Sequence, residues 1–281
     1  MRFILEAPAA AAWSAAMRRE GRSIGFVPTM GALHEGHLAL VARAKAECGA
    51  VCASVFVNPL QFNNPEDLRH YPRQLEQDRR LLADAGCDML FAPGAESIYQ
   101  DHSPRHYDLG GLDDVLEGPL RPGHFQGVVN VVERLFHYVR PDAAYFGLKD
   151  RQQLAVIGHV AETLRWPERI VPCETLRAPD GLALSSRNQR LDPAERAVAP
   201  VLYRGLRAIR DVAFTLPVSE ARAAGERIIL STPQARLDYL AIADPATLQP
   251  LEDWGDRAEA VALVAAWVGP VRLIDNLTLR R

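Results

Sequence analysis

Two histidines, His34 and His37, stand three residues apart behind a short apolar run and a glycine. Residues 27–37 read Val-Pro-Thr-Met-Gly-Ala-Leu-His-Glu-Gly-His, which predicts a buried strand that passes through a glycine turn into a helix. Free backbone N–H groups at a helix N-terminus bind phosphate, and side chains three apart share one helix face. Such a pair of imidazoles can stabilise the negative charge that develops when an α-phosphate is attacked.

Two other interpretations of this histidine pair stay open. A metal would need a third ligand, which the neighbouring sequence lacks, and the spacing differs from that of a zinc-protease helix. An accidental surface pair is the ordinary explanation of two isolated histidines. The strand and glycine turn that precede the pair favour nucleotide chemistry over both.

A second polar group follows the next apolar run, at residues 54–62. Asn58 and Gln61 are neutral amides at the carboxyl end of a predicted strand, and amides bind hydroxyls and carboxylates without adding charge. An ordinary polar loop is the alternative for this short pattern.

Lys149 is one of only two lysines, with Lys45, in a chain whose other strong cations are arginines. It follows a predicted strand that ends at Gly147, where a compact point charge would lie near bound phosphates. Gln153 is four residues further on and faces the same way.

Another polar segment follows the Asp180-Gly181 turn, where Ser185, Ser186 and Arg187 are consecutive. Two hydroxyls and a guanidinium, which can bind phosphate through two parallel hydrogen bonds, form a flexible phosphate clamp.

The elements that must position these groups alternate between strand and helix in the first part of the chain. Strands are predicted at 23–28, 51–57, 88–93 and 143–147, and helices at 33–48, 75–85 and 128–139. This alternation predicts an α/β fold, a Rossmann-like, doubly wound parallel sheet, whose ligands bind at the carboxyl ends of the strands.

The pattern changes after about residue 176. Helices are predicted at 193–210 and 218–230, followed by strands at 236–243, 258–267 and 271–276. We therefore predict two domains, a Rossmann-like domain over residues 1–175 that binds nucleotide and substrate, and a smaller C-terminal α+β domain over 176–281 that carries the clamp.

Composition narrows the function classes. The 281 residues are 48% hydrophobic and 24% charged, with a formal net charge of -3, and no basic stripe indicates a nucleic-acid partner. The late apolar run 260–268 is far shorter than the ~20 residues of a membrane span. The four cysteines are scattered without a metal-binding pattern, as is typical of buried thiols in the cytoplasm.

The string Pro-Thr-Met-Gly-Ala-Leu-His-Glu-Gly-His resembles the signature of the HIGH-type nucleotidylyltransferase superfamily and is similar to that of the pantothenate synthetase family in particular. Further motifs at 54–62, 66–73, 118–128, 145–154 and 182–188 follow in the family's order. The likeness covers residues 25–190, and the C-terminal third carries no motif that we can interpret.

The resemblance implies an ATP-dependent ligase that condenses pantoate with β-alanine through a pantoyl adenylate, releasing AMP and pyrophosphate, with Mg²⁺ on the phosphates. It implies catalytic roles for His34, His37, Lys149 and Arg187. The implied ATP site comprises Met30, Gly31, His34, His37, Gly147, Leu148, Lys149, Asp150, Leu176, Leu184, Ser185, Ser186 and Arg187. Pantoate or β-alanine would contact Asn58, Gln61 and Gln153.

Two residues are less determined. The resemblance makes Asp78 a candidate Mg²⁺ contact, while a solvated acid on a helix surface is an equal alternative. Arg121 lies in a Gly/Pro-rich loop that borders the family's active site, and we assign it no firm role.

Other function classes are weaker. A nucleotidylyltransferase that acts on a phosphorylated acceptor would not need the Asn58, Gln61 and Gln153 amides. A class I tRNA synthetase would need a basic tRNA surface and an anticodon domain. A nucleotide sensor without turnover would not need every catalytic side chain. The family is dimeric, so a homodimer is expected.

Overall fold

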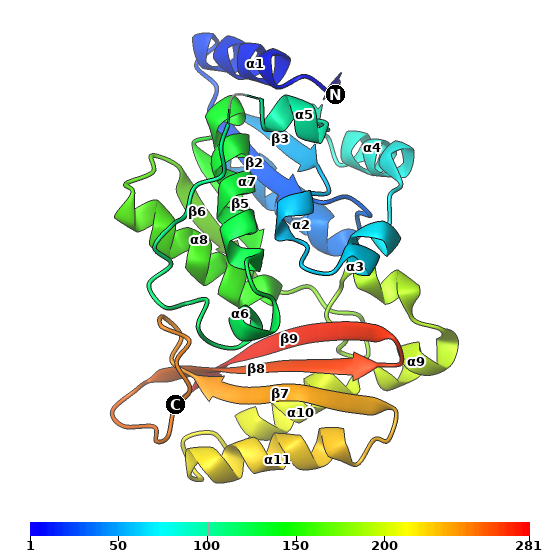
Figure 1. Ribbon diagram of the computed structural model, residues 1–281, viewed down its shortest axis with the longest axis vertical. Coiled ribbons are helices and arrows are strands. Elements are labelled where there is room, and N and C mark those ends of the chain that lie inside the picture. Colours follow the sequence, from blue (N-terminus) through cyan, green and yellow to red (C-terminus); the bar gives the residue numbers. More distant parts are fainter. Residues whose placement is uncertain (101) are drawn as a thin grey trace. The chain divides into compact units, whose positions relative to one another are not determined.

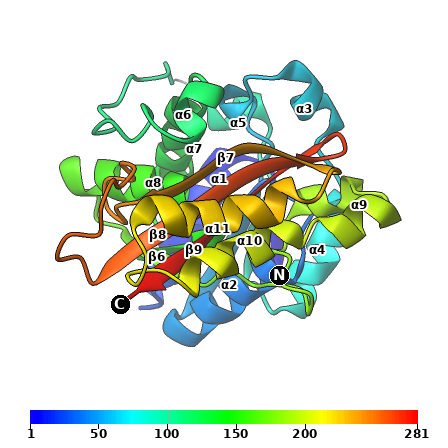
Figure 2. The same ribbon diagram turned by 90° about the horizontal axis from the view of Figure 1, so that it is seen from below.

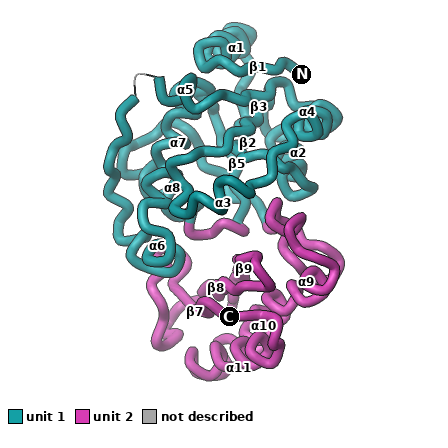
Figure 3. Tube along the Cα trace, turned by 45° about the vertical axis from the view of Figure 1, so that its right-hand side comes forward, with its two compact units in different colours: residues 1–148, 153–174 teal, residues 149–152, 175–281 magenta. Residues whose placement is uncertain are grey.

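The computed structural model describes residues 1–100 and 102–281, which form two compact units (Figure 3). The first unit contains residues 1–148 and 153–174, and the second contains 149–152 and 175–281. The short segment 149–152 therefore groups with the C-terminal part of the chain, although its sequence neighbours on both sides belong to the first unit. The assignment of substrate roles to two domains stays a prediction.

The first unit is built on a six-stranded parallel sheet with the strand order β1-β4-β3-β2-β5-β6. Figure 1 labels β2, β3, β5 and β6 of this sheet. On the central strand β2, Phe26 lies opposite Cys52 of β3 on one side and Ala144 of β5 on the other. The strands are β1 (Arg2–Ile4), β2 (Ile24–Thr29), β3 (Ala50–Val55), β4 (Met89–Phe91), β5 (Ala143–Gly147) and β6 (Arg169–Cys173).

The direction of winding reverses between β2 and β5. From β2 the chain proceeds outward through β3 to β4, and it then crosses to the other side of β2 to form β5 and β6. In open α/β sheets ligands bind at the carboxyl ends of the strands at such a reversal. The turn after Thr29 and the segment after Gly147 both begin there.

Helices cover both faces of this sheet. Consecutive strand residues point to opposite sides of it, so each face carries its own apolar core. Phe26 packs in the core that includes residues of α1 and α7, whereas Val27 packs in the core that includes residues of α2 and α4. The helices and short 3₁₀ turns are α1 (Ala7–Arg19), α2 (Glu35–Glu47), η1 (Pro59–Gln61), α3 (Pro65–His70), α4 (Leu75–Asp84), α5 (Ala95–Ile98), α6 (Glu117–Leu120), α7 (His124–Val139), η2 (Leu148–Asp150) and α8 (Arg151–Thr163).

The second unit packs two helices, α10 and α11, on one face of an antiparallel three-stranded sheet β7-β8-β9 (Figures 1 and 2). The helices approach closely at Gly205 and Gly225, where a Cβ on Gly225 would lie 2.9 Å from the Gly205 carbonyl oxygen. Its elements are η3 (Ser186–Arg190), α9 (Pro193–Val198), α10 (Val201–Arg210), α11 (Val218–Leu230), β7 (Ala235–Ala243), β8 (Glu259–Val268) and β9 (Val271–Arg280).

The predicted fold class is confirmed, with corrections to individual elements. The elements β1, β6 and α8 were not predicted from the sequence. The single helix predicted over 193–210 is two helices, because Pro200 has no N–H and cannot continue a helix at that point. The last strand extends past Asn276 to Arg280, since residues 277–280 continue to pair with β8.

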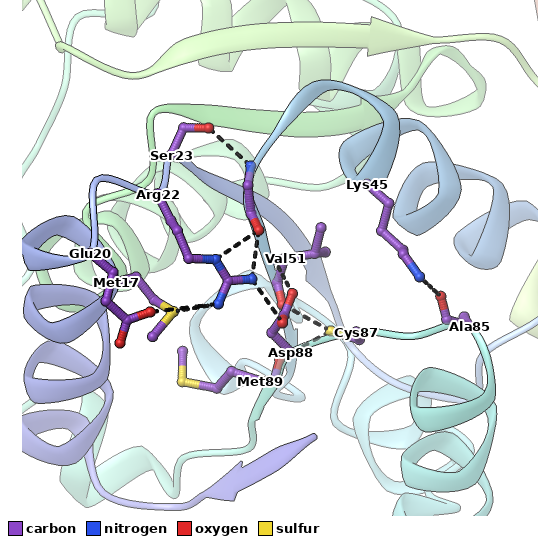
Figure 4. Close-up of polar contacts among 11 residues, drawn as sticks. Met17, Glu20, Arg22, Ser23, Lys45, Val51, Ala85, Cys87, Asp88 and Met89 are labelled. Carbon is purple, nitrogen blue, oxygen red and sulfur yellow. Dashed lines mark hydrogen bonds and ion pairs between the residues drawn. The ribbon is translucent and has the colours of Figure 1, made fainter.

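A polar cluster ties the amino ends of β2, β3 and β4 together (Figure 4). These ends lie opposite the carboxyl ends of the strands, where the turn after Thr29 begins. The Arg22 guanidinium donates to the Gly49 carbonyl and to Asp88, whose other oxygen accepts from the Val51 N–H. Lys45, the second lysine of the chain, donates to the Ala85 carbonyl, which belongs to the C-cap of α4. Its role is therefore structural.

Across residues 1–100 and 102–281, no helix is both long enough and apolar enough to cross a membrane.

Candidate active site

The turn between β2 and α2 is held by one buried carboxylate. Asp78, in the first turn of α4, accepts hydrogen bonds from the backbone N–H groups of Ala32 at 3.0 Å and Leu33 at 2.7 Å. The turn places Gly31 at φ +86° and Ala32 at φ +51°. A Cβ on Gly31 would lie 2.9 Å from the carboxylate Oδ2 of Asp78, so this position requires glycine.

Asp78 is only 1% exposed, so the alternative of a solvated surface acid is wrong. Burial raises the pKa of its carboxyl, while the two backbone hydrogen bonds act in the opposite direction. Each carboxylate oxygen accepts from a turn amide. The geometry therefore makes Asp78 a positioning group for the turn that leads into the histidine helix.

The backbone fixes the protonation pattern of the two histidine rings. His34 is the N-cap of α2, and its Nδ1 accepts from the Gly36 N–H at 3.1 Å, while Nδ1 of His37 accepts from the His34 N–H at 3.3 Å. A ring nitrogen that accepts carries no proton, so each neutral imidazole bears its proton on Nε2. The ring centroids are 4.1 Å apart. Two Nε2–H donors at a helix N-terminus form an arrangement suited to anionic oxygen.

Asn58 is buried at 1% exposure and has its full hydrogen-bonding capacity used inside the chain. Its Nδ2 donates to the Gln61 side-chain oxygen and to the Gly127 carbonyl, and its Oδ1 accepts from the Leu60 N–H and the Tyr99 hydroxyl. An amide side chain has two donor hydrogens and two acceptor lone pairs. Asn58 therefore locks η1 to α7 and α5 rather than presenting a polar group to a ligand.

Gln61 is the amide of this group that can exchange a partner. Its Nε2 donates to the thioether sulfur of Met30 at 3.1 Å, and sulfur is a weak acceptor. Nδ1 of His124 donates to the Gln61 carbonyl at 2.7 Å and holds its backbone in place. The contact joins the Gln61 amide to the turn before His34, so two of the predicted sites, Met30 for nucleotide and Gln61 for substrate, are neighbours.

The second unit holds the other predicted phosphate-binding groups. Lys149 lies in η2 and pairs with Asp150, with 3.4 Å between Nζ and Oδ1. Ser185 is the N-cap of η3 and accepts from the Arg187 N–H at 3.2 Å, and Ser186 is buried. The predicted clamp is therefore a capped 3₁₀ turn rather than a plain loop.

The remaining predicted residues occupy defined elements. Gly147 ends β5, Leu148 begins η2, and Gln153 lies in the first turn of α8. The Leu184 N–H donates to the Leu176 carbonyl at 3.0 Å and closes a hairpin ahead of Ser185. The Arg121 side chain is largely buried beside Glu117, with 3.9 Å between Nη1 and Oε2, so it is not a solvated loop arginine.

Comparison with known proteins decides the family. The family described as pantoate–β-alanine ligase matches residues 3–278. The chain belongs to this family. It is 53% identical to the pantothenate synthetase of Thermus thermophilus over 265 residues, which cover 94% of this chain and 95% of the relative. It is 52% identical to that of Rubrobacter xylanophilus over 272 residues, which cover 93% of each chain.

Solved structures agree with this ligase assignment. The crystal structure of the Thermus thermophilus pantothenate synthetase matches with a TM-score of 0.92 at 52% identity and covers 99% of both chains. The Francisella tularensis ligase, complexed with β-γ ATP and β-alanine, matches with a TM-score of 0.81 at 35% identity over 99% of this chain and 97% of that one. The predicted family and enzyme class are confirmed.

Several residues that hold the predicted site residues or their neighbours in place could not be predicted from the sequence. His124 ends a Gly/Pro-rich loop that was singled out, but nothing in its spacing indicated the bond to Gln61. Tyr99, whose hydroxyl holds Asn58 at 2.7 Å, lies in a segment without periodicity. Asp275 and Asn276 lie in the C-terminal third, and side-chain contacts between distant segments, which local sequence does not reveal, join them to Arg177 and Lys149.

Proposed function

We propose that this ligase condenses pantoate with β-alanine at the expense of ATP through a pantoyl-adenylate intermediate. A pantoate carboxylate oxygen attacks the α-phosphorus, and the bond to pyrophosphate breaks. The β-alanine amine, after losing a proton to solvent, then attacks the acyl carbon, and AMP leaves. Adenylation is needed because a carboxylate is a poor acyl donor near neutral pH.

The observation that carries this proposal is the paired orientation of His34 and His37. Their Nδ1 atoms accept backbone N–H groups, so both Nε2–H groups act as fixed donors at the N-terminus of α2. Donors fixed in advance stabilise developing charge without reorganisation. Attack at the α-phosphate places that charge where these donors and the helix dipole act.

Pantoate is proposed to bind at Gln61 and Gln153. The Gln61 amide exchanges the Met30 sulfur for a ligand hydroxyl or carboxylate oxygen, which is a stronger acceptor. In the proposed site, Asn58 does not bind the substrate directly. It positions Gln61, because Asn58 Nδ2 donates to the Gln61 Oε1 at 3.2 Å.

The phosphates of ATP are proposed to contact Lys149, Arg187 and the hydroxyls of Ser185 and Ser186. Lysine supplies a point charge, whereas arginine supplies two parallel hydrogen bonds to one phosphate. With the reactants aligned and their charge neutralised, little covalent work is left to the protein.

Magnesium is proposed to enter with ATP and, when bound, to neutralise charge on the phosphates. Asp78 does not fit the role of metal ligand, because its buried carboxylate accepts two turn amides. Among residues 1–100 and 102–281, no group of three or more His, Cys, Asp or Glu side chains could hold a metal ion. A cytoplasmic location and a homodimer also stay predictions.

Product analysis tests the proposed reaction. Incubation with ATP, Mg²⁺, pantoate and β-alanine should yield pantothenate and AMP in equal amounts, measured by mass spectrometry and nucleotide chromatography. Formation of ADP in place of AMP would exclude the adenylate. A final product that joins nucleotide and pantoate, with no amide formed, would show that the enzyme is a nucleotidyltransferase instead.

A further inference from the structure

Two neighbouring residues of β9, Asp275 and Asn276, are buried polar groups that the proposed mechanism does not use. Their exposures are 5% and 6%. Because successive strand residues point to opposite faces, Asp275 lies on the side of Leu273 and Leu279, which pack against α10 and α11. Asn276 lies on the other side. Two adjacent strand positions therefore make polar contacts on opposite faces of the strand.

On the first face, Asp275 forms a two-point ion pair with Arg177. The guanidinium Nη1 lies 2.6 Å from Oδ2 and Nη2 lies 2.9 Å from Oδ1. Arg177 also donates to the Gly181 carbonyl at 3.2 Å and to the Asn276 carbonyl at 3.0 Å, and its Cζ lies 4.1 Å from the ring centroid of Tyr203. Because its guanidinium is hydrogen-bonded to several groups at once, Arg177 is fixed in place and holds those groups together.

Arg177 belongs to the hairpin that leads into the clamp. It pairs with Ala183 across the hairpin, and a Cβ on Gly181 at its tip, where φ is +93°, would lie 2.2 Å from the Tyr203 ring. Ser185 follows directly after this hairpin and caps η3. The position of the clamp is therefore set by Arg177 and, through it, by Asp275.

On the second face, the Asn276 Nδ2 donates to the backbone carbonyl of Lys149 at 2.9 Å. This contact lies within the second unit, to which residues 149–152 belong. The bond fixes the peptide of Lys149 from the strand side. The Asn276 N–H in turn donates to the Asp275 Oδ1 at 2.7 Å.

We propose that Asp275 and Asn276 are positioning residues that set two phosphate-binding segments, the Lys149 turn and the Ser185–Arg187 clamp, from opposite faces of β9. This inference rests on the proposed nucleotide roles of those segments. It gives the C-terminal sheet a function in nucleotide binding that no motif in that part of the chain indicates.

Asn276→Ala tests the inference most cleanly, because it removes the donor to Lys149 and leaves the Arg177–Asp275 pair intact. We expect ATP to bind about 5-fold more weakly by calorimetry, as for the loss of one fixed hydrogen bond. The KM for pantoate should not change, and deuterium exchange of the amides of residues 149–152 should be faster. The isosteric Asn276→Asp variant, which faces the Lys149 carbonyl with an acceptor, should change in the same direction.

Leu273→Ala is the matched control, since Leu273 is a buried residue of the same strand that packs in the core. It should lower the melting temperature at least as much as Asn276→Ala but leave ATP affinity within about 2-fold of wild type, because it removes no hydrogen bond to either phosphate-binding segment. Unchanged ATP affinity in both Asn276 variants, or an equal loss in Leu273→Ala, would overturn the inference.

Failure of the proposed reaction would be distinguishable from failure of this inference. A wild-type protein that binds ATP but shows no pantoate-dependent chemistry would contradict the reaction only. The Asn276 effects on ATP affinity and on deuterium exchange would still be measured in that protein.

Discussion

At the scale of single residues, the backbone decides which nitrogen of His34 and of His37 carries the proton. Both Nδ1 atoms accept from N–H groups of the α2 cap, so the donor function belongs to Nε2. The same residues thus complete the helix cap and, in the proposed mechanism, supply donors for the reaction. The two roles can be separated because asparagine imitates Nδ1 and glutamine imitates Nε2.

His37→Ala should lower the rate of pantoate-dependent ATP–pyrophosphate exchange by about 10²–10³-fold, as for loss of one donor to developing charge, with unchanged far-UV circular dichroism. His37→Asn keeps an acceptor near the Nδ1 position and should be as inactive as alanine. His37→Gln should regain part of the rate. A near wild-type rate in the asparagine variant would remove Nε2 of His37 from the mechanism.

At the scale of elements, the candidate site depends on contacts that fix the η1 turn and the helix α2. The η1 turn, which carries Gln61, touches α7 at Gly127, where an added Cβ would lie 2.2 Å from the Leu60 carbonyl oxygen. The far end of α2 is held by Glu47, which binds Arg43 in the same helix, Tyr145 in β5 and Arg169 in β6. The first contact fixes the turn that carries Gln61, and the second anchors the helix that carries His37.

Gly127→Ala should displace η1 and raise the KM for pantoate at least about 10-fold, because small misplacements of binding groups are costly, while the KM for ATP stays near wild type. Gly158→Ala is the matched control in α8, where an added Cβ meets no atom within 4 Å. It should leave both KM values unchanged and stabilise the helix by about 0.5–1 kcal/mol. Equal pantoate KM values in the two variants would contradict the role of this contact.

Glu47→Gln tests the anchor of α2 through pH. Hydrogen bonds from Arg43, Arg169 and Tyr145 lower the pKa of Glu47 from 4.5 to about 2. A carboxyl with a lowered folded pKa stabilises the protein above its unfolded pKa, and this contribution is lost as pH falls through the folded value. The free energy of unfolding of wild type should therefore exceed that of the variant at neutral pH, and the difference should shrink as the pH falls below 4.5 toward 2.

Urea unfolding at a series of pH values measures this difference. Glu162→Gln, at an exposed position of α8, serves as the control and should show no such trend. A wild-type advantage that persists unchanged down to about pH 2 would show that the Glu47 contacts do not depend on its charge.

At the scale of the whole molecule, sequence revealed the strand–helix alternation and the order of the motifs, because buried strands and capped helices leave local patterns. It misjudged Asp78, since no local pattern shows that α4 turns this acid inward to two amides of a distant turn. Asn58 was a similar case. Its partners come from separate segments of the chain, so its positioning role became visible only in the fold.

The contacts of the C-terminal sheet were the least predictable part of the structure from the sequence. Asp275 and Asn276 look like an ordinary polar interruption of a strand, and their partners Arg177 and Lys149 lie far away along the chain. Contacts of this kind join segments that are distant along the chain, so no local sequence pattern predicts them.

In the proposed reaction, pantoate is activated by adenylation before the amine reacts. Pyrophosphate release from ATP and Mg²⁺ should be measured with pantoate alone and then with β-alanine added. We expect no release without pantoate, one equivalent per active site with pantoate alone, and sustained release with AMP once β-alanine is present. Release that is independent of pantoate, or that appears only when the amine is present, would contradict the proposed reaction.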